Sequence, residues 1–261
     1  TMSGALDATS TDTIILNNGD FLDVQSGVVS QAVSVASGAT ATIMGQPRFA
    51  SAITLTDNTS VLQVAMTTEL NQSVSGAGTL SLLDDLSLGY GVALPSLVSM
   101  NQKTLNLYGS SYASAVTFSG GGSFFLDTST ALTETWTVGS GSEVYHVNGN
   151  GTILDLSSNG NIVFNGATMY VSDCVVRGLS DTNAFKGTGR YVFSNVTLEM
   201  GANFTRTDGS FTFRGEACKV ITNGATFNIS GAGNEILVDG IILKYDQLDG
   251  SGTNPFSAVS G

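Results

Sequence analysis

A segment of nine residues occurs three times in this chain at a constant spacing. Its copies read VFNGATMYV at 163–171, VFSNVTLEM at 192–200 and ITNGATFNI at 221–229. The first, seventh and ninth positions are apolar in every copy, and the sixth is threonine. A fixed period of about 20 to 50 residues is typical of repeat proteins, in which each copy is one structural unit. The spacing therefore predicts a repeat fold.

Within each copy, apolar and polar residues alternate with a period of two. Met169 and Val171 alternate with Thr168, Tyr170 and Ser172. Alternation of this kind places the apolar residues on one face of a half-buried β-strand. The Asn-Gly or Ser-Asn pair before each strand favours a turn, because glycine and asparagine tolerate a positive φ angle.

Similar short strand patterns fill the rest of the chain. GTLSL at 78–82 and KTLNL at 103–107 are two examples, and Gly- and Asn-rich turns separate the other strand-like segments. The longest helix-like run, 91–100, is interrupted by Pro95. The pattern predicts an all-β protein without substantial helix.

We predict a parallel β-helix, or β-solenoid, of about nine or ten coils with roughly 25 to 29 residues in each. The solenoid forms a single domain over 1–261, less regular to about residue 110 and most regular over 150–245. The alternative is a β-sandwich or jelly roll, which also contains many short strands but does not require three copies in phase.

The composition argues against several classes of partner. The net charge is −12, and only 11% of the 261 residues are charged. Nucleic-acid phosphates and anionic lipids both attract clusters of lysine and arginine, whereas this chain has 21 acidic residues against 9 basic ones. No run of about 18 apolar residues predicts a membrane-spanning helix. The first residues, TMSGALDATS, resemble the start of a chain after removal of a signal peptide, so we expect an exported protein.

Candidate site residues are few. Tyr170, Glu199 and Asn228 match in the repeat, so we expect them to share one exposed face, where they supply a single acid. Asp84 and Asp85 are consistent with a polar turn, since adjacent strand residues point to opposite faces. Asp246 and Asp249 flank a glycine turn and are a weak candidate for calcium.

The histidine and the basic residues offer weaker candidates still. His146, the single histidine, falls in a strand pattern, and a catalytic triad or a zinc site built on it has little support. Basic residues gather in one third of the chain, where surface pairing is the simplest role and a patch for an acidic subunit or glycan is the alternative. They are Arg177, Lys186, Arg190, Arg206, Arg214 and Lys219.

The two cysteines, Cys174 and Cys218, are expected to be buried free thiols, with a disulfide as the alternative. Counted from matching repeat positions they fall at different phases of the coil, which disfavours the short Cα separation of a disulfide. Six Asn-x-Ser/Thr sequons are candidates for glycosylation of an exported protein. They are Asn58, Asn71, Asn150, Asn195, Asn203 and Asn228.

The rhythm of short strands and Gly/Asn turns resembles that of right-handed parallel β-helix proteins. These include pectate-lyase-like enzymes and surface rods such as autotransporter passengers and polymorphic outer-membrane proteins. The resemblance covers most of the chain and lies in the coil rhythm. It implies a secreted or surface protein with the right-handed crossover usual for parallel strands.

Our leading hypothesis is a secreted, non-enzymatic structural subunit without a cofactor, which self-assembles head to tail into an extracellular filament, sheath or surface layer. Neither terminal segment shows a capping helix, so neighbouring copies are expected to cover the open strand edges. One alternative is a glycan-binding adhesin or phage tail-fibre module with an aromatic stripe formed by Trp136, Tyr145 and Tyr170. A second is a polysaccharide lyase or hydrolase, which requires several acids converging in a groove.

Overall fold

The computed structural model is an all-β, parallel β-solenoid of about ten turns. It describes residues 12–182, 185–206, 208–214, 217–229, 236–239 and 244–245. Within these ranges, no helix has the length and apolarity needed to cross a membrane. The predicted fold class is confirmed.

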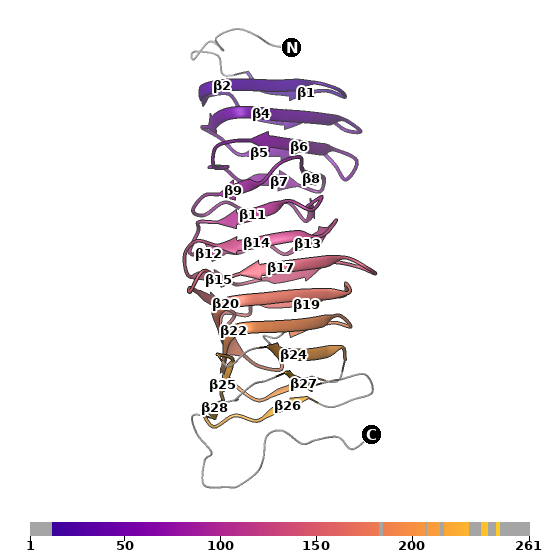
Figure 1. Ribbon diagram of the computed structural model, residues 1–261. Coiled ribbons are helices and arrows are strands. Elements are labelled where there is room, and N and C mark those ends of the chain that lie inside the picture. Colours follow the sequence, from indigo (N-terminus) through magenta and orange to yellow (C-terminus); the bar gives the residue numbers. More distant parts are fainter. Residues whose placement is uncertain are drawn as a thin grey trace. The chain divides into compact units, whose positions relative to one another are not determined.

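The chain divides into two compact units, Thr1–Ser123 and Phe124–Gly261. The strands of the first unit stack as successive rungs (Figure 1). They are β1 (Ile14–Leu16), β2 (Phe21–Val29), β3 (Val33–Val35), β4 (Thr40–Phe49), β5 (Ile53–Leu55), β6 (Val61–Met66), β7 (Val74–Gly76), β8 (Thr79–Leu82), β9 (Leu86–Leu88), β10 (Leu97–Ser99), β11 (Thr104–Leu107), β12 (Ser111–Tyr112) and β13 (Val116–Ser119). The single-domain organisation stays a prediction.

Strand β14 (Gly122–Leu126) crosses the division between the units. The later strands are β15 (Thr130–Leu132), β16 (Thr135–Val138), β17 (Val144–Asn148), β18 (Ile153–Asp155), β19 (Asn161–Phe164), β20 (Thr168–Leu179), β21 (Phe185–Lys186), β22 (Arg190–Met200), β23 (Phe204–Arg206), β24 (Ser210–Arg214), β25 (Lys219–Ile221), β26 (Phe227–Ile229), β27 (Ile236–Asp239) and β28 (Lys244–Tyr245).

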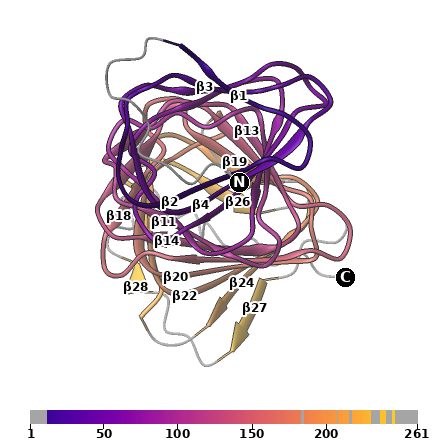
Figure 2. The same ribbon diagram turned by 90° about the horizontal axis from the view of Figure 1, so that it is seen from above.

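Parallel sheets form the sides of the coil in the first unit. One sheet has the order β1-β3-β5-β7, a second runs β2-β4-β6-β8-β10-β13, and β9 pairs with β11 in a third. Figure 2 shows β1 and β3 along one side of the coil and β2 and β4 along another. Each strand pairs with the strand one turn further along the chain, so Thr42 pairs with Gln63 and, in the same sheet, Val61 pairs with Thr79.

The second unit builds its turns on two long strands that bend at a corner. In β20 and β22, Ser172 pairs with Ser194 and Cys174 with Val196. The residues between these pairs, Asp173 and Asn195, each have a φ of 55°. A left-handed residue turns the strand, and Asn195 Nδ2 donates a hydrogen bond of 2.8 Å to Asp173 Oδ1 in the preceding turn. The short polar side chain lets asparagine and aspartate adopt this conformation at little cost.

Inward-facing residues form apolar columns in each unit, as strand alternation requires. In the first unit, Leu22, Ile43, Val64 and Leu82 stack in register and are buried. The core of the second unit is aromatic: Phe193 packs on Phe211 and on Phe213 with ring centroids 5.1 and 5.2 Å apart. Aromatic packing adds about 0.5 to 1.5 kcal/mol per pair beyond area burial.

The turns built on β20 and β22 are shorter than predicted. Thr168 pairs with Arg190 and Val175 with Thr197, so one turn here contains 22 residues. The hydrogen-bonded side chains of Arg177 and Glu199 are also 22 residues apart. The spacing between copies of the repeated segment is therefore longer than one turn. Each copy consequently lies one side further around the coil than the copy before it. Each copy lies on a different side: Met169 in the first half of β20, Leu198 in the second half of β22, and Phe227 in β26.

The three repeat-matched candidates are consequently not stacked. Tyr170 pairs with Val192, Glu199 pairs with Arg177 and Ile221, and Asn228 pairs with Thr205. The single exposed face predicted for Tyr170, Glu199 and Asn228 does not form. A turn-and-strand segment serves equally well at any corner of the coil, so its recurrence does not fix the length of a turn.

Candidate functional site

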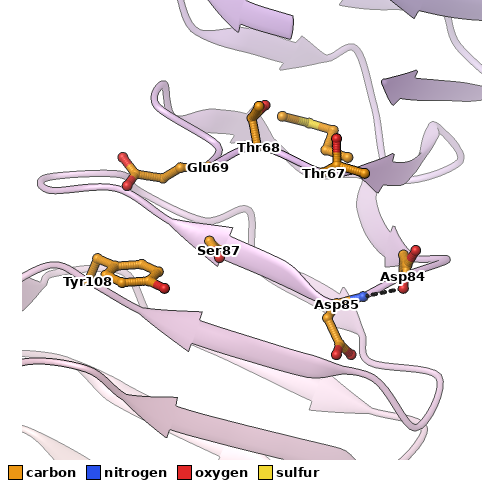
Figure 3. A pocket seen from close by; sticks show the side chains of 8 residues that line it. Thr67, Thr68, Glu69, Asp84, Asp85, Ser87 and Tyr108 are labelled. Atoms are coloured by element: carbon orange, nitrogen blue, oxygen red, sulfur yellow. Dashed lines mark hydrogen bonds between the residues drawn. The ribbon is translucent and has the colours of Figure 1, made fainter. Parts of the chain in front are cut away.

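A cleft of about 370 Å³ opens on the first unit. It is lined by Met66, Thr67, Thr68, Glu69, Asp84, Asp85, Ser87 and Tyr108. The lining comes from the segment after β6, the turn before β9, β9 itself and the residue after β11 (Figure 3). With three carboxylates and one exposed tyrosine, this cleft is the candidate site for acid–base chemistry.

The two adjacent aspartates of the cleft hold the turn before β9. Asp84 Oδ1 accepts the Asp85 N–H at 2.9 Å, and Asp85 Oδ1 accepts the Thr104 N–H of the next turn at 2.7 Å. The polar turn predicted at Asp84 and Asp85 is confirmed. Both side chains are exposed and line the same cleft, because they lie in a turn and not in a strand.

Glu69 lies at the other end of β9, beside Gly89. A methyl group at Gly89 would collide with Glu69 Oε1, so the glycine leaves room for this carboxylate. Figure 3 shows Glu69 and Tyr108 toward one end of β9 and Asp84 and Asp85 at the other. The four steps from Asp85 to Gly89 span about 13 Å of extended chain. For comparison, the paired carboxyl groups of glycoside hydrolases lie about 5 to 9.5 Å apart, less than this backbone span.

The predicted aromatic stripe does not form. Trp136 and Tyr145 are buried in the core of the second unit, at 4% and 0% exposure. Tyr170 faces outward and stacks on His146, with ring centroids 4.9 Å apart and planes 13° apart. Parity explains the difference: His146 alternates with Tyr145, so only one of the two can face solvent.

The predicted basic cluster is divided between the surface and the core. On the surface, Arg177 Nε donates to Glu199 Oε2 at 2.9 Å, and this ion pair raises the pKa of Arg177. Arg190 Nε donates to Thr212 Oγ1 at 3.2 Å. Lys186, Arg214 and Lys219 are exposed, and Arg206 is buried. The six bases therefore do not share one patch.

Arg206 is held inside the solenoid by backbone carbonyls and aromatic rings. Nη1 donates to the Phe185 carbonyl at 2.5 Å, and Nη2 donates to the carbonyls of Gly187 and Gly189 at 2.9 Å each. The guanidinium carbon lies 5.0 Å from the ring centroid of Tyr191 and 4.8 Å from that of Phe211. Burial lowers the pKa of Arg206, against the opposing influence of Tyr191 and Asp208. No pattern in the sequence marks it as a core residue.

Both cysteines are free and buried, and the disulfide alternative is not realised. Cys174 lies on β20 opposite Val196, whereas Cys218 precedes β25 and its Sγ donates to the Phe193 carbonyl at 3.5 Å. Burial raises the pKa of the Cys174 thiol to about 12.

The remaining candidates concern metal and glycan attachment. Asp246 and Asp249 lie outside the described residues, and among the residues that are described no group of His, Cys, Asp and Glu is arranged to hold a metal ion. Of the sequons, Asn58, Asn150, Asn195 and Asn203 are exposed. Asn71 is half-buried; its side chain accepts a hydrogen bond from the Phe49 N–H and donates one to the Phe49 carbonyl. The side chain of Asn228 is not among those that the structure describes.

Within the described residues, the first turn has unpaired strand edges, which the sequence analysis expected, and exposed apolar side chains, which it did not single out. In the described part of the chain, β1 pairs with β3 alone and β2 with β4 alone. Ile15, Phe21 and Val28 on these strands are 60%, 50% and 61% exposed. Ile14 N–H donates to Ala32 and Leu16 C=O accepts from Ala36, so the backbone groups of Ile15 point away from β3 toward the open edge.

At the other end of the described chain, β26, β27 and β28 are each last in their sheets. No protein-family model matches the chain, and no curated protein and no solved structure matches it either.

Proposed function

We propose that this protein is a structural subunit that assembles head to tail by strand addition, with β1 and β2 of one copy pairing with β26, β27 and β28 of the next. The open edge of the first turn carries this proposal. Proteins that stay monomeric usually blunt such edges with lysine, proline or charge. Neither β1 nor β2 contains lysine or proline. Strand β2 has one charge, Asp23, and a register shift between Val24 and Gly27, and the two strands expose Ile15, Phe21 and Val28.

Two different edges meet in this contact, so it is heterologous and does not close on itself. Repetition of a non-closing contact produces a filament. Main-chain hydrogen bonds would supply the affinity, as in other cases of strand addition, and the apolar side chains would be covered by the neighbouring copy. Secretion, a surface location, the right-handed coil and kinship with autotransporter passengers or pectate-lyase-like proteins belong to the same proposal.

Electron microscopy of the purified protein and of an Ile15→Pro variant tests the proposal. Proline removes the N–H that points to the open edge and leaves the bonds of Ile14 and Leu16 to β3 in place. We expect filaments from the wild type and none from Ile15→Pro. Ile15→Thr keeps the N–H with a smaller apolar side chain, and it should still polymerise.

Two results would overturn the proposal. One is a wild type that stays monomeric at every concentration. The other is an Ile15→Pro variant that polymerises like the wild type. A lower melting temperature of the Ile15→Pro monomer, with no filaments in either protein, would show that another segment of the same chain occupies this edge.

The cleft supports a second candidate, a glycan-binding or glycan-cleaving surface. Tyr108 can stack on a sugar ring, and Glu69, Asp85 and Ser87 can bond to hydroxyl groups. A Tyr108→Ala variant should lose binding to a glycan array, whereas Tyr90→Ala, at an exposed tyrosine outside the cleft, should retain it. Equal binding by both variants would remove this candidate.

A further inference from the structure

Arg206 joins two turns of the second unit at a place where their strands are not paired. Among the described strands, β21 pairs with β19, whereas β23, which contains Arg206, pairs with β26 in a separate sheet. The guanidinium of Arg206 nevertheless reaches β21 and the bend that follows it. There it bonds to the carbonyls of Phe185, Gly187 and Gly189. Within the described residues, one side chain therefore takes the place of a strand ladder between these two turns.

Three backbone carbonyls converge on this guanidinium, and we call them the carbonyl site. Nη1 donates to the Phe185 oxygen at 2.5 Å, and Nη2 donates to the oxygens of Gly187 and Gly189 at 2.9 Å each. The bonds to Phe185 and Gly189 are buried, and a buried carbonyl that lacks a donor destabilises a fold. The turn that contains β21 therefore depends on a donor from another part of the chain.

A glycine between β23 and β24 leaves room for the guanidinium. Gly209 has a φ of 64°, a left-handed conformation that glycine adopts at little cost. A methyl group there would overlap both Arg206 Nη2 and the Gly189 oxygen. The backbone around the carbonyl site is thus shaped to hold a planar group with forked donors.

Two buried aromatic rings complete the surroundings of the carbonyl site. The guanidinium carbon lies over the rings of Tyr191 and Phe211, 5.0 and 4.8 Å from their centroids. A guanidinium is weakly hydrated, stacks on aromatic rings and donates from a fixed planar fork, whereas an ammonium is a strongly hydrated point charge. This environment therefore favours a guanidinium over an ammonium of the same charge.

We propose that the carbonyl site is a binding site for guanidinium groups, which the native chain fills with its own Arg206. Filling the site closes the turn that contains β23 onto the turn that contains β21, and an empty site lets the two turns separate more often. A free guanidinium compound should therefore replace the Arg206 side chain when that side chain is removed. Guanidinium binding involves none of the open strand edges, so it is independent of filament assembly.

Chemical rescue of an Arg206→Ala variant tests this proposal. The substitution removes the side chain beyond Cβ and leaves a space that matches ethylguanidinium. Hydrogen exchange of the Gly189 and Arg190 amides, which donate to the Phe164 and Ala167 carbonyls, should be at least about a hundredfold faster than in the wild type. So small a ligand binds weakly, and we expect half-maximal protection at about 1 mM ethylguanidinium chloride. At about 10 mM, exchange should slow about tenfold.

Matched compounds and variants isolate the carbonyl site. Ethylammonium carries the charge without the fork, and ethylurea carries the planar shape without the charge, so at about 10 mM each should change the exchange rate less than about twofold. Gly209→Ala in the Arg206→Ala background places a methyl group in the site and should abolish the rescue. Arg214→Ala, at an exposed arginine of β24, should neither accelerate exchange in the segment 185–191 nor respond to ethylguanidinium.

An Arg206→Lys variant provides a second readout if Arg206→Ala does not fold. It keeps the charge and removes the fork, so exchange of the Gly189 and Arg190 amides should be about tenfold faster than in the wild type. All variants are compared in the Ile15→Pro background, in which the proposed filaments do not form, so the result is separate from the proposed function. Three results would each contradict guanidinium binding: ethylguanidinium that leaves Arg206→Ala unprotected, ethylammonium that protects it equally, or a wild-type exchange rate in Arg206→Lys.

Discussion

Arg206 offers a sharp test of how the second unit is held together. Its guanidinium donates three hydrogen bonds to the carbonyls of Phe185, Gly187 and Gly189, which belong to the preceding turn of the coil. Arg206→Met keeps an unbranched apolar stem and removes those donors. The three carbonyls would then lose their charged hydrogen-bond donor. The site is buried, since the Arg206 residue is only 4% exposed in the native protein.

The expected loss follows from the number of bonds. A hydrogen bond to a charged group contributes about 1.5 to 3 kcal/mol, so three contribute about 6 kcal/mol in all. The methionine variant no longer buries a cation, which costs several kcal/mol in the native protein. This gain offsets about half of the lost hydrogen-bond energy. We expect Arg206→Met to destabilise the segment around 185–191 by about 3 kcal/mol, which is roughly a hundredfold in its opening equilibrium.

Hydrogen–deuterium exchange with peptide resolution measures this change. The amides of Gly189 and Arg190, which donate to the Phe164 and Ala167 carbonyls, should exchange roughly a hundredfold faster in Arg206→Met. Arg214→Met is the matched control at an exposed position and should leave the segment unchanged. Peptides from β4 in the first unit serve as an internal reference. The reasoning is refuted if both arginine variants accelerate exchange equally, or if neither does.

Three further predictions concern pH, backbone conformation and thiols. Hydrogen bonds from Ser37 and Thr59 hold the pKa of Asp57 below its ordinary value of 3.8, so this carboxylate stabilises the fold above about pH 4 and the contribution is lost as the pH falls further. Thermal unfolding should show that Asp57→Asn flattens this acid-side decline, and an unchanged profile would contradict it. Gly45→Ala should lower the unfolding free energy by about 3 kcal/mol and Gly19→Ala by about 1 kcal/mol in urea titrations. Both glycines have a positive φ, but only at Gly45 would a methyl group collide, with the Val24 carbonyl. Cys174, whose pKa burial raises to about 12, and the buried Cys218 should both resist iodoacetamide at pH 8 until urea unfolds the chain, and rapid native labelling would refute their burial.

The sequence was sufficient to predict the fold class, because alternation within strands reports directly which residues face the core. Met169 and Val171 are buried as predicted, and so are Leu198 and Phe227. The length of a turn could not be predicted from the repeat. Similar segments recur at successive corners, and turns differ in length: the step from Val61 to its partner Thr79 is shorter than that from Trp136 to Ile162. The repeat is longer than the turn here because its copies lie on successive sides of the coil.

The same argument explains why functional residues were hard to find. Parity assigns a residue to the inside or the outside, but only the stacking of turns decides which outside residues become neighbours. Tyr170 stacks on His146 of the preceding turn and not on the repeat-matched Glu199. Register likewise places Val61, Thr79 and Leu97 in one row across successive turns, although no common motif connects them. In a solenoid with turns of unequal length, a surface consists of residues from several turns. Those residues can be identified only when the register of the strands is known.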